Sequence, residues 1–214
     1  MAWFWDPDTG EYYDDTGQRL DAAALRDLMR KRQAEVLARI VAAVALLTAQ
    51  PDERRSADFM DSLRDLLADW YTQQYLLGRG GLAQMTAADW KSITDMLAAQ
   101  DDLLAGFARD IAEGKLSEAQ IVARTRQYLD GSGQAFERGN ARAHGVPDLP
   151  AYPKDGRTEC NIGCGCGWRI EDLHDDKGDP AGWDCYWELG TTKEKCPDCL
   201  VNTAVWYPLH VDMP

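Results

Sequence analysis

The sequence predicts a mainly α-helical protein: a bundle of about four helices, with a short N-terminal hairpin before it and a small β-containing zinc-knuckle module after it. Apolar residues recur at helical spacing between residues 21 and 147. Aromatic pairs alternate with turn residues near the N-terminus, and all six cysteines lie within residues 160–199. We therefore expect an N-terminal arm (1–20), a helical bundle (21–147), a linker (148–157) and a cysteine-rich module (158–214).

The composition is that of an acidic globular chain. Its 214 residues include 36 Asp and Glu against 23 Lys and Arg, so the net charge is -13. Such a charge repels phosphate backbones and argues against direct nucleic-acid binding, the commonest role of a small zinc module. No apolar stretch reaches the roughly 18 residues that a membrane span requires, so we expect no membrane contact.

The N-terminal arm combines aromatic residues with turn signals. Trp3-Phe4-Trp5 and Tyr12-Tyr13 are each followed by Asp, Thr and Gly residues, which is typical of a β-hairpin. Two strands alone are marginally stable in water, so these aromatic side chains need a surface to pack on. That surface is either the chain's own helices or a neighbouring subunit, because exposed aromatic patches usually mark contacts.

The first two predicted helices are separated by a proline. Asp21 can cap a helix that runs to about Ala49, and Gln50-Pro51 ends it and starts the next. The second helix stops at the glycine-rich run 78–81, which lacks the preceding strand and the Lys-Ser/Thr ending of a phosphate loop.

Capping boxes mark the next two helices. Thr86 with Asp89 opens the third, and Ser117 with Gln120 opens the fourth. The later part of the fourth is rich in Gly and Ala, which lets another helix approach closely and predicts a break near 131–133. The apolar positions expected to face the core of the bundle include Leu28, Val36, Ile40, Val41, Val44, Leu47, Phe59, Leu63, Leu67, Trp70, Trp90, Ile93, Leu104, Phe107, Ile121, Tyr128 and Leu129.

The cysteines carry the strongest chemical signal. Cys160, Cys164 and Cys166 form one group, and Cys196 and Cys199 form a second group about thirty residues later. Two knuckles at this spacing can present four thiolates to one Zn2+. The glycines next to the first group allow the turns with φ > 0 that direct backbone N–H groups onto sulfur. We therefore predict one structural Zn2+ per chain.

The choice of the four ligands is open at this level. Cys196 and Cys199 form the firmest pair, because Pro197 fixes the backbone of their turn. Cys160 with either Cys164 or Cys166 completes the set, and one of these three cysteines lies beside the ligands. Cys185 stands in an aromatic, strand-like run and is expected to be a small buried hydrophobe. His174 is an alternative ligand, but its charged neighbours are typical of a solvated turn.

Disulfides and a redox pair are the alternatives to a metal. Six cysteines could form three disulfides, and Cys-x2-Cys also occurs in redox sites. The chain begins Met1-Ala2-Trp3-Phe4 without a basic segment, a long apolar run or a cleavage site. We therefore expect a reducing compartment, in which cysteine pairs of this kind more often bind a metal.

The module is predicted to contain a hairpin. Residues 166–170 and 183–189 each have the pattern of a short strand, and an Asp/Gly/Pro turn joins them, so the metal is expected at the end of this hairpin. Four tryptophans are expected to supply the core that so small a module otherwise lacks: Trp168, Trp183, Trp187 and Trp206.

The run Leu116 to Arg124 and the run Phe136 to Ala141 lead directly into the cysteine-rich module. This arrangement resembles phage minor head proteins of the Mu-type head morphogenesis family. Cys196-Pro197-Asp198-Cys199 matches the family's Cys-x2-Cys, and Cys164-Gly165-Cys166 matches its Cys-x-Cys. The order of the two clusters is reversed here, and Cys160 stands where a His-Pro dipeptide is common.

The resemblance implies a virion component that acts in head assembly, near the portal or on the inner capsid face. Its partners would be the portal protein or the major capsid protein, and it would be present in multiple copies in a symmetric assembly. It would be made in the cytoplasm of the bacterial host.

Two other functions are less well supported by the residues. A zinc-dependent hydrolase or nuclease needs an open metal position and a general base, yet the three histidines show no paired spacing. Glu159 and Glu171 flank the first cysteine group but have the pattern of solvated acids. A DNA-binding zinc ribbon would need basic residues around the cysteines, whereas the basic stretch 26–32 belongs to the first helix.

Overall fold

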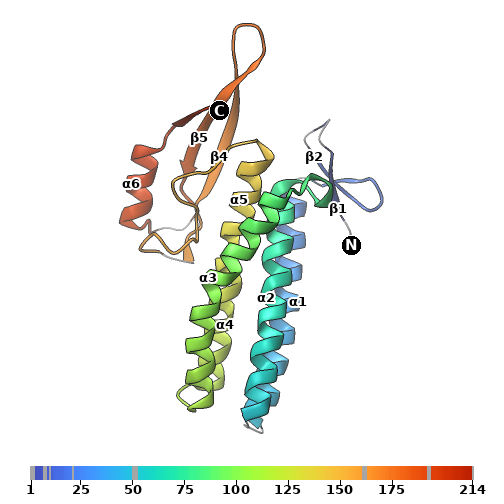
Figure 1. Cartoon of the computed structure of the whole chain (residues 1–214), viewed down its shortest axis with the longest axis vertical. Coiled ribbons are helices and arrows are strands. Elements are labelled where there is room, and N and C mark those ends of the chain that lie inside the picture. The colour runs from blue at the N-terminus through green and yellow to red at the C-terminus, as the bar shows by residue number, and fades with distance from the viewer. Residues whose placement is uncertain are drawn as a thin grey trace. The chain divides into compact units, whose positions relative to one another are not determined.

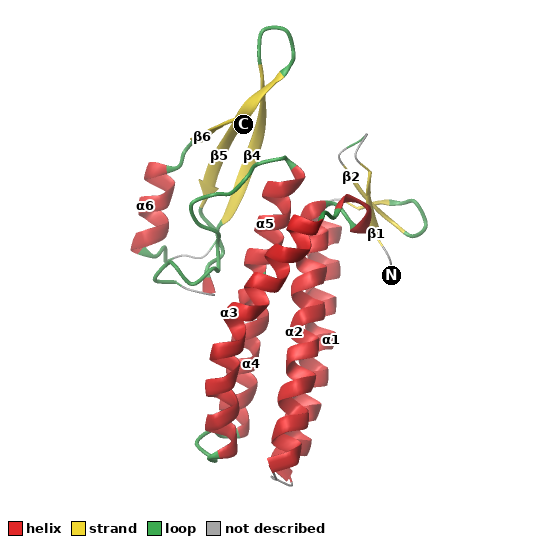
Figure 2. Ribbon diagram, viewed as in Figure 1, coloured by secondary structure: helices red, strands yellow, loops and turns green. Residues whose placement is uncertain are grey.

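The computed structural model is mainly helical (Figure 1 and Figure 2), as predicted. It describes residues 3–6, 9, 11–20, 22–49, 53–160, 163–191 and 194–213. In chain order the elements are β1 (Trp3–Asp6), β2 (Glu11–Asp14), β3 (Arg19–Leu20), α1 (Ala22–Ala49), α2 (Glu53–Arg79), the 3-10 helix η1 (Leu82–Gln84), α3 (Ala87–Ala112), α4 (Glu118–Gly131), α5 (Gly133–Ala143), β4 (Gly167–His174), β5 (Pro180–Glu188), α6 (Pro197–Val205) and β6 (Leu209–Asp212). No described helix is both long enough and apolar enough to cross a membrane.

The chain divides into two compact units. The first comprises Met1–Gln73 and Gly80–Leu129, and the second comprises Gln74–Arg79 and Asp130–Pro214. This division differs from the boundary that we expected at residue 147. The second unit contains α5 and the last residues of α2 in addition to the expected linker and cysteine-rich module.

The N-terminal sheet has three strands where two were predicted. β1 pairs with β2, and β2 pairs in turn with β3, where Tyr13 lies opposite Arg19. The side chains of Trp3, Phe4 and Trp5 lie outside the described part of the structure, so their expected packing surface is not described. β3, at the end of the arm, contacts α1.

The helices of the first unit bury one apolar stripe each. On α1, Val36, Ile40, Val44 and Leu47 are buried at intervals of four, four and three residues, the spacing of one helix face. The predicted core positions Val41 and Trp90 are wrong: their side chains are 38% and 43% exposed. Val41 follows Ile40 by one residue, a rotation of about 100° that turns it away from the stripe. The expected Asp21 cap and Gln50-Pro51 break lie outside the described residues.

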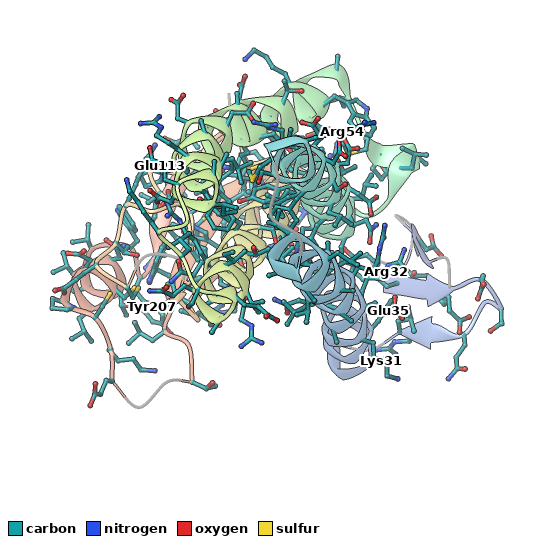
Figure 3. All side chains as sticks on the ribbon, turned by 90° about the horizontal axis from the view of Figure 1, so that it is seen from below. Lys31, Arg32, Glu35, Arg54, Glu113 and Tyr207 are labelled. Carbon is teal, nitrogen blue, oxygen red and sulfur yellow. The ribbon has the colours of Figure 1, made fainter. Side chains whose placement is uncertain are left out.

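The described end of the basic stretch on α1, Lys31 and Arg32, is exposed. Arg32 pairs with Glu35 on the same helix at 3.2 Å, and both side chains are more than half exposed. Lys31 is exposed beside them (Figure 3). This agrees with the prediction that the stretch is the polar face of an amphipathic helix.

Both predicted capping boxes form. The Asp89 carboxylate accepts the Thr86 N–H at 2.8 Å, and the Thr86 hydroxyl oxygen accepts the Asp89 N–H at 3.3 Å. At the start of α4, Gln120 and Ser117 make the same reciprocal pair of hydrogen bonds. The predicted break falls at Ser132, between α4 and α5. Local hydrogen bonding therefore sets these helix ends.

Small residues let α5 and the end of α2 pack backbone against backbone. A Cβ atom added to Gly78 would lie 2.1 Å from the carbonyl oxygen of Phe136, and one added to Gly139 would lie 2.4 Å from that of Tyr75. No side chain fits at either position without a shift of the backbone. The glycines of this region thus permit the close helix approach that the sequence predicted.

The second unit is built on an antiparallel sheet with the order β4-β5-β6. The predicted hairpin is present and is longer than expected: β4 pairs with β5 from Gly167–Glu188 to His174–Pro180. β6 then pairs with β5, with Leu209 opposite Cys185. Neither β6 nor α6 was predicted. β6 has four residues and α6 has nine. Segments this short carry no strong periodic pattern, so their structure depends on packing within the unit.

Tryptophans fill the core of this unit, as predicted. Trp168, Trp183 and Trp187 are buried, and Trp206 packs against them. The rings of Trp168 and Trp187 meet edge to face with centroids 5.2 Å apart. This is a preferred geometry for aromatic pairs.

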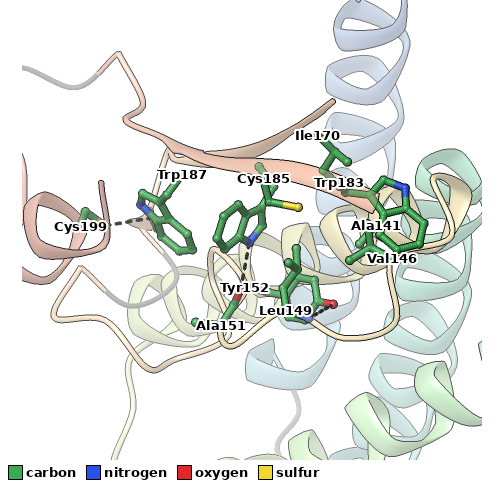
Figure 4. Close-up of a cluster of buried hydrophobic side chains, with 12 residues drawn as sticks. Ala141, Val146, Leu149, Ala151, Tyr152, Ile170, Trp183, Cys185, Trp187 and Cys199 are labelled. Carbon is green, nitrogen blue, oxygen red and sulfur yellow. Dashed lines mark hydrogen bonds between the residues drawn. The ribbon is translucent and has the colours of Figure 1, made fainter. Parts of the chain in front are cut away.

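The segment 148–157 is more than a linker. Leu149, Ala151 and Tyr152 are buried among the tryptophans (Figure 4), and the Trp168 indole N–H donates to the Ala151 carbonyl oxygen at 2.9 Å. The expectation of a linker rested on its prolines and turn residues. Those residues do set an irregular backbone, but the side chains between them are apolar and complete the core.

Candidate metal centre

Five of the six cysteines gather in the second unit. The Sγ atoms of Cys160, Cys196 and Cys199 lie within 4.8 Å of one another, and so do those of Cys164, Cys166 and Cys199. Cys199 belongs to both groups: its Sγ lies 3.5 Å from Cys160 Sγ and 3.6 Å from Cys164 Sγ. The structure therefore brings together all five predicted ligands in a cluster that could hold a metal ion, with Cys199 at its centre.

The first turn of α6 positions one side of the cluster. Cys196 is the N-cap residue, Pro197 occupies the first turn, and the Cys199 N–H donates to Cys196 Sγ at 3.4 Å. Proline suits this position because the first N–H groups of a helix have no intrahelical acceptor. The predicted Cys-Pro-x-Cys turn is thus the start of a helix, and Cys199 is 2% exposed.

The other side of the cluster comes from the loop that leads into β4. Cys166 directly precedes the first residue of that strand, so the cluster lies at the end of the hairpin, as predicted. One hydrogen bond ties the two sides together: the Glu159 N–H donates to the Asp198 carboxylate at 2.7 Å. Next to it, the buried Thr158 hydroxyl lies 3.3 Å from Cys160 Sγ.

The thiols share their protons unevenly. The Cys164 thiol donates to Cys166, and the Gly190 N–H adds to this effect, so the pKa of Cys166 is lowered to about 5 although burial opposes it. The pKa of Cys164 is raised because its proton is held by Cys166 and because it is buried. Burial likewise raises the pKa of Cys199. A cation would replace these shared protons and stabilise all the thiolates at once.

One buried donor near Cys166 supports this interpretation. The Trp187 side chain is fully buried, and its indole N–H has no hydrogen-bond partner among the described residues. It faces Cys166 closely enough to contribute to the low pKa of that thiol. A buried N–H without an acceptor is costly, and a negatively charged metal–thiolate cluster would supply one.

The sulfur spacing is compatible with a shared metal ion. Four thiolates around Zn2+ at about 2.3 Å stand about 3.8 Å from one another at the corners of a tetrahedron. The separations of 3.5 and 3.6 Å are close to that value. A disulfide joins its sulfurs at about 2.05 Å, and all six cysteines are free.

The remaining candidates stand apart from the cluster. Cys185 is fully buried, as predicted, and burial raises its pKa to about 11. His174 is exposed at the end of β4, and Glu159 and Glu171 are exposed as well. Among the described residues, both groups of candidate ligands consist of cysteine alone.

Glu137 is a supporting residue that the sequence did not indicate. Its carboxylate, on α5, accepts the backbone N–H of Trp168 at 2.9 Å and so holds the start of β4 next to the cluster. Burial raises the pKa of Glu137 to about 7, although the Trp168 N–H and the charge of Lys154 oppose the shift. Because Glu137 lies thirty-one residues before Trp168 in the sequence, no local sequence pattern indicates this contact.

No protein-family model matches this chain, and neither does any curated protein or solved structure to which it was compared. The chemistry of the cysteine cluster is therefore the firmest guide to its function.

Proposed function

We propose that this chain is a non-enzymatic structural protein of a phage or prophage virion, a minor head protein that acts in head assembly through protein–protein contacts. Its cysteine-rich module holds one structural Zn2+. The observation that carries the metal part of the proposal is the convergence of five cysteines on Cys199. The virion role is supported by the resemblance of the helical body and cysteine groups to Mu-type head morphogenesis proteins.

Cys160, Cys164, Cys196 and Cys199 form the ligand set of this proposal. Cys160 and Cys164 are supported by their distances to Cys199, which match a tetrahedral edge. Cys196 is supported by its place in the first turn of α6, from which it lies close to both Cys160 and Cys199. Cys166 remains beside the ion as a fifth thiol, and the N–H groups of Gly190 and Trp187 lie near it.

A structural role fits the surroundings of the site. A closed set of four cysteine ligands is one of the usual forms of structural zinc, whereas catalytic zinc keeps a position open for water or substrate. The cluster adjoins the tryptophan core, in which Trp187 and Cys199 belong to the same set of buried residues (Figure 4). Structural zinc contributes roughly 10–16 kcal/mol in small metal-dependent domains, enough to order a module of this size.

The head-assembly role agrees with the charge and the helical body. A chain of net charge -13 can engage a basic surface on a portal or capsid protein. A symmetric shell would present many copies of both partners, so individually weak contacts would add up.

Zinc quantitation on protein purified under reducing conditions tests the metal part. We expect about one zinc per chain. Cys164→Ser is expected to remove it and Cys166→Ser to retain it, since only the former belongs to the proposed ligand set. Stoichiometric disulfides without metal would overturn the zinc proposal, and loss of zinc only from the Cys166 variant would overturn the ligand set.

Quantitative mass spectrometry of purified particles tests the virion part. A fixed ratio of this chain to the portal or major capsid protein is expected, and the ratio itself would distinguish a neck ring from a shell-lining position. Absence of the chain from particles, while it is abundant in induced cells, would contradict the proposal.

A further inference from the structure

From Cys199 onward, α6 and the residues just after it form an uncharged stretch in a highly charged chain. Residues 199–209 contain no Asp, Glu, Lys or Arg, although such residues make up 28% of the sequence. A helix whose outer face meets water ordinarily carries charged or polar residues there. This outer face therefore calls for a separate explanation.

The inner face of α6 is set by firm contacts. The Thr203 hydroxyl donates to the carbonyl oxygen of Cys199 at 3.0 Å, and it also lies 3.2 Å from that of Trp187. Trp206, at the end of the helix, packs on Trp187 with ring centroids 5.8 Å apart. Cys199, Thr203 and Trp206 are spaced by four and three residues, so this side faces the core.

The opposite side of α6 exposes apolar side chains. Leu200, Val201 and Val205 are 49%, 59% and 62% exposed, and Ala204 lies between them on the same face. Tyr207 follows at 55% exposure, and it is labelled in Figure 3. These five residues are referred to as the α6 patch.

The α6 patch is held in place rather than loosely attached. The ring of Tyr207 meets that of Tyr186 edge to face, with centroids 5.0 Å apart, and Tyr186 in turn lies under the Arg169 guanidinium. Single exposed apolar residues are ordinary on protein surfaces. A contiguous set of them on a rigid support, with no charge among them, is typical of an interaction site.

The module that carries the patch is acidic. Residues 158–214 contain eleven Asp and Glu against four Lys and Arg. Asp198 is exposed in the first turn of α6, and Arg169 is already paired with both Glu171 and Glu188. The module that carries the patch therefore has a negative net charge, which favours a basic partner.

We propose that the α6 patch docks a protein segment whose apolar side chains are flanked by Lys or Arg. A second copy of this chain does not fit, because it would bring two acidic modules together. Anionic lipid and nucleic acid are repelled for the same reason. The proposal depends on the exposed apolar face of α6 and on the negative charge of residues 158–214. It holds whether or not the chain is a virion component.

A pair of synthetic helical peptides of about 15 residues tests this proposal. Both carry the same leucine face, and the polar face is lysine in one and glutamate in the other. Isothermal titration calorimetry on the full-length, zinc-loaded protein is expected to detect binding of the lysine peptide only. Val201→Asp and Val205→Asp are each expected to weaken it about tenfold.

Leu103→Asp is the matched control, because Leu103 is an apolar side chain of α3 with 54% exposure and the substitution adds the same charge. It is expected to change the affinity less than about twofold. Retained zinc content and tryptophan circular dichroism would establish that the Val201 variant is folded. Equal binding of both peptides, or equal affinities of the Val201 and Leu103 variants, would overturn the proposal. So would sedimentation that reveals a dimer lost on Val201→Asp, since the occupant would then be a second copy.

Discussion

Cys199 lies at the point where the two cysteine groups meet. It contributes to both sets of sulfurs, it is buried, and its backbone N–H donates to Cys196. Replacement of its thiolate by a hydroxyl removes the one sulfur that belongs to both groups of candidate ligands. We expect Cys199→Ser to lose the metal and most of the stability of the second unit, as measured by zinc content and by tryptophan circular dichroism on heating.

Cys185→Ala is the control for this prediction. Cys185 is equally buried but lies in neither group. Its replacement removes one buried sulfur and leaves a small cavity, at a cost of about 1 kcal/mol. The zinc content should be unchanged. Equal zinc loss in the two variants would mean that the cluster around Cys199 is not the metal site.

Glu137 makes the stability of the second unit depend on pH. Because burial raises the pKa of this carboxyl from 4.5 to about 7, the folded state binds its proton more tightly than the unfolded state does. The contribution to stability is therefore full below about pH 4.5 and is lost as the pH rises through about 7. Above that pH the folded protein carries a desolvated carboxylate whose main compensation is the Trp168 N–H.

Glu137→Gln should remove this dependence. The amide oxygen can still accept the Trp168 N–H, while the buried charge is absent. At pH 8 we expect the variant to be more stable than the wild type by on the order of 2 kcal/mol, and the difference should vanish toward pH 5. Urea unfolding at several pH values measures the difference in the free energy of unfolding between the variant and the wild type. The cysteines titrate in both proteins, so their contribution cancels in this difference. The exposed Asp176→Asn is the control, and a similar pH-dependent difference there would contradict the assignment to Glu137.

At the scale of elements, the packing of α5 on the end of α2 depends on glycine. Gly139→Ala would place a Cβ atom 2.4 Å from the Tyr75 carbonyl oxygen, so the helices must separate. We expect a destabilisation of about 2–3 kcal/mol, measured by urea unfolding followed by far-ultraviolet circular dichroism.

Gly106→Ala provides the opposite case within a helix. Gly106 lies inside α3, and an added Cβ atom would meet nothing within 4 Å. Alanine there should stabilise the protein by about 0.5–1 kcal/mol, because it lowers the backbone entropy of the unfolded chain. If Gly139→Ala were also stabilising, the close contact of the two helices would be refuted.

At the scale of the whole molecule, the two units should respond differently to a chelator. The first unit has its own helical core, with Ile40, Leu63 and Phe107 buried in it, whereas the second combines a small sheet with the cysteine cluster. Removal of zinc is expected to abolish the tryptophan circular dichroism and to expose the second unit to protease. Most of the helical signal should remain.

Mass spectrometry of the proteolytic fragments checks this expectation. Early cleavage should fall between residues 148 and 214, and the helices of the first unit should survive. Readdition of zinc should restore protection. Simultaneous loss of both units on chelation, or no change in either, would contradict a structural zinc confined to the second unit.

Much of the architecture follows from the sequence itself. The capping boxes at Thr86 and Ser117, the break at Ser132 and the apolar stripe of α1 all depend on residues within one or two turns, so they can be predicted without the fold. The grouping of the cysteines is likewise visible as spacing. Val41 and Trp90 were misassigned because apolar character alone does not decide which side of a helix is covered.

The mainly helical fold, the helix ends and a group of cysteines suited to a metal can be predicted from the sequence, because each of these depends on neighbouring residues or on spacing. The burial of residues 149–152 in a core, the support of β4 by Glu137 and the place of Cys199 in two groups of sulfurs are known only from the folded structure. Those contacts join residues about fifteen to forty positions apart. Their partners are chosen by the packing of the whole unit, which no local pattern records.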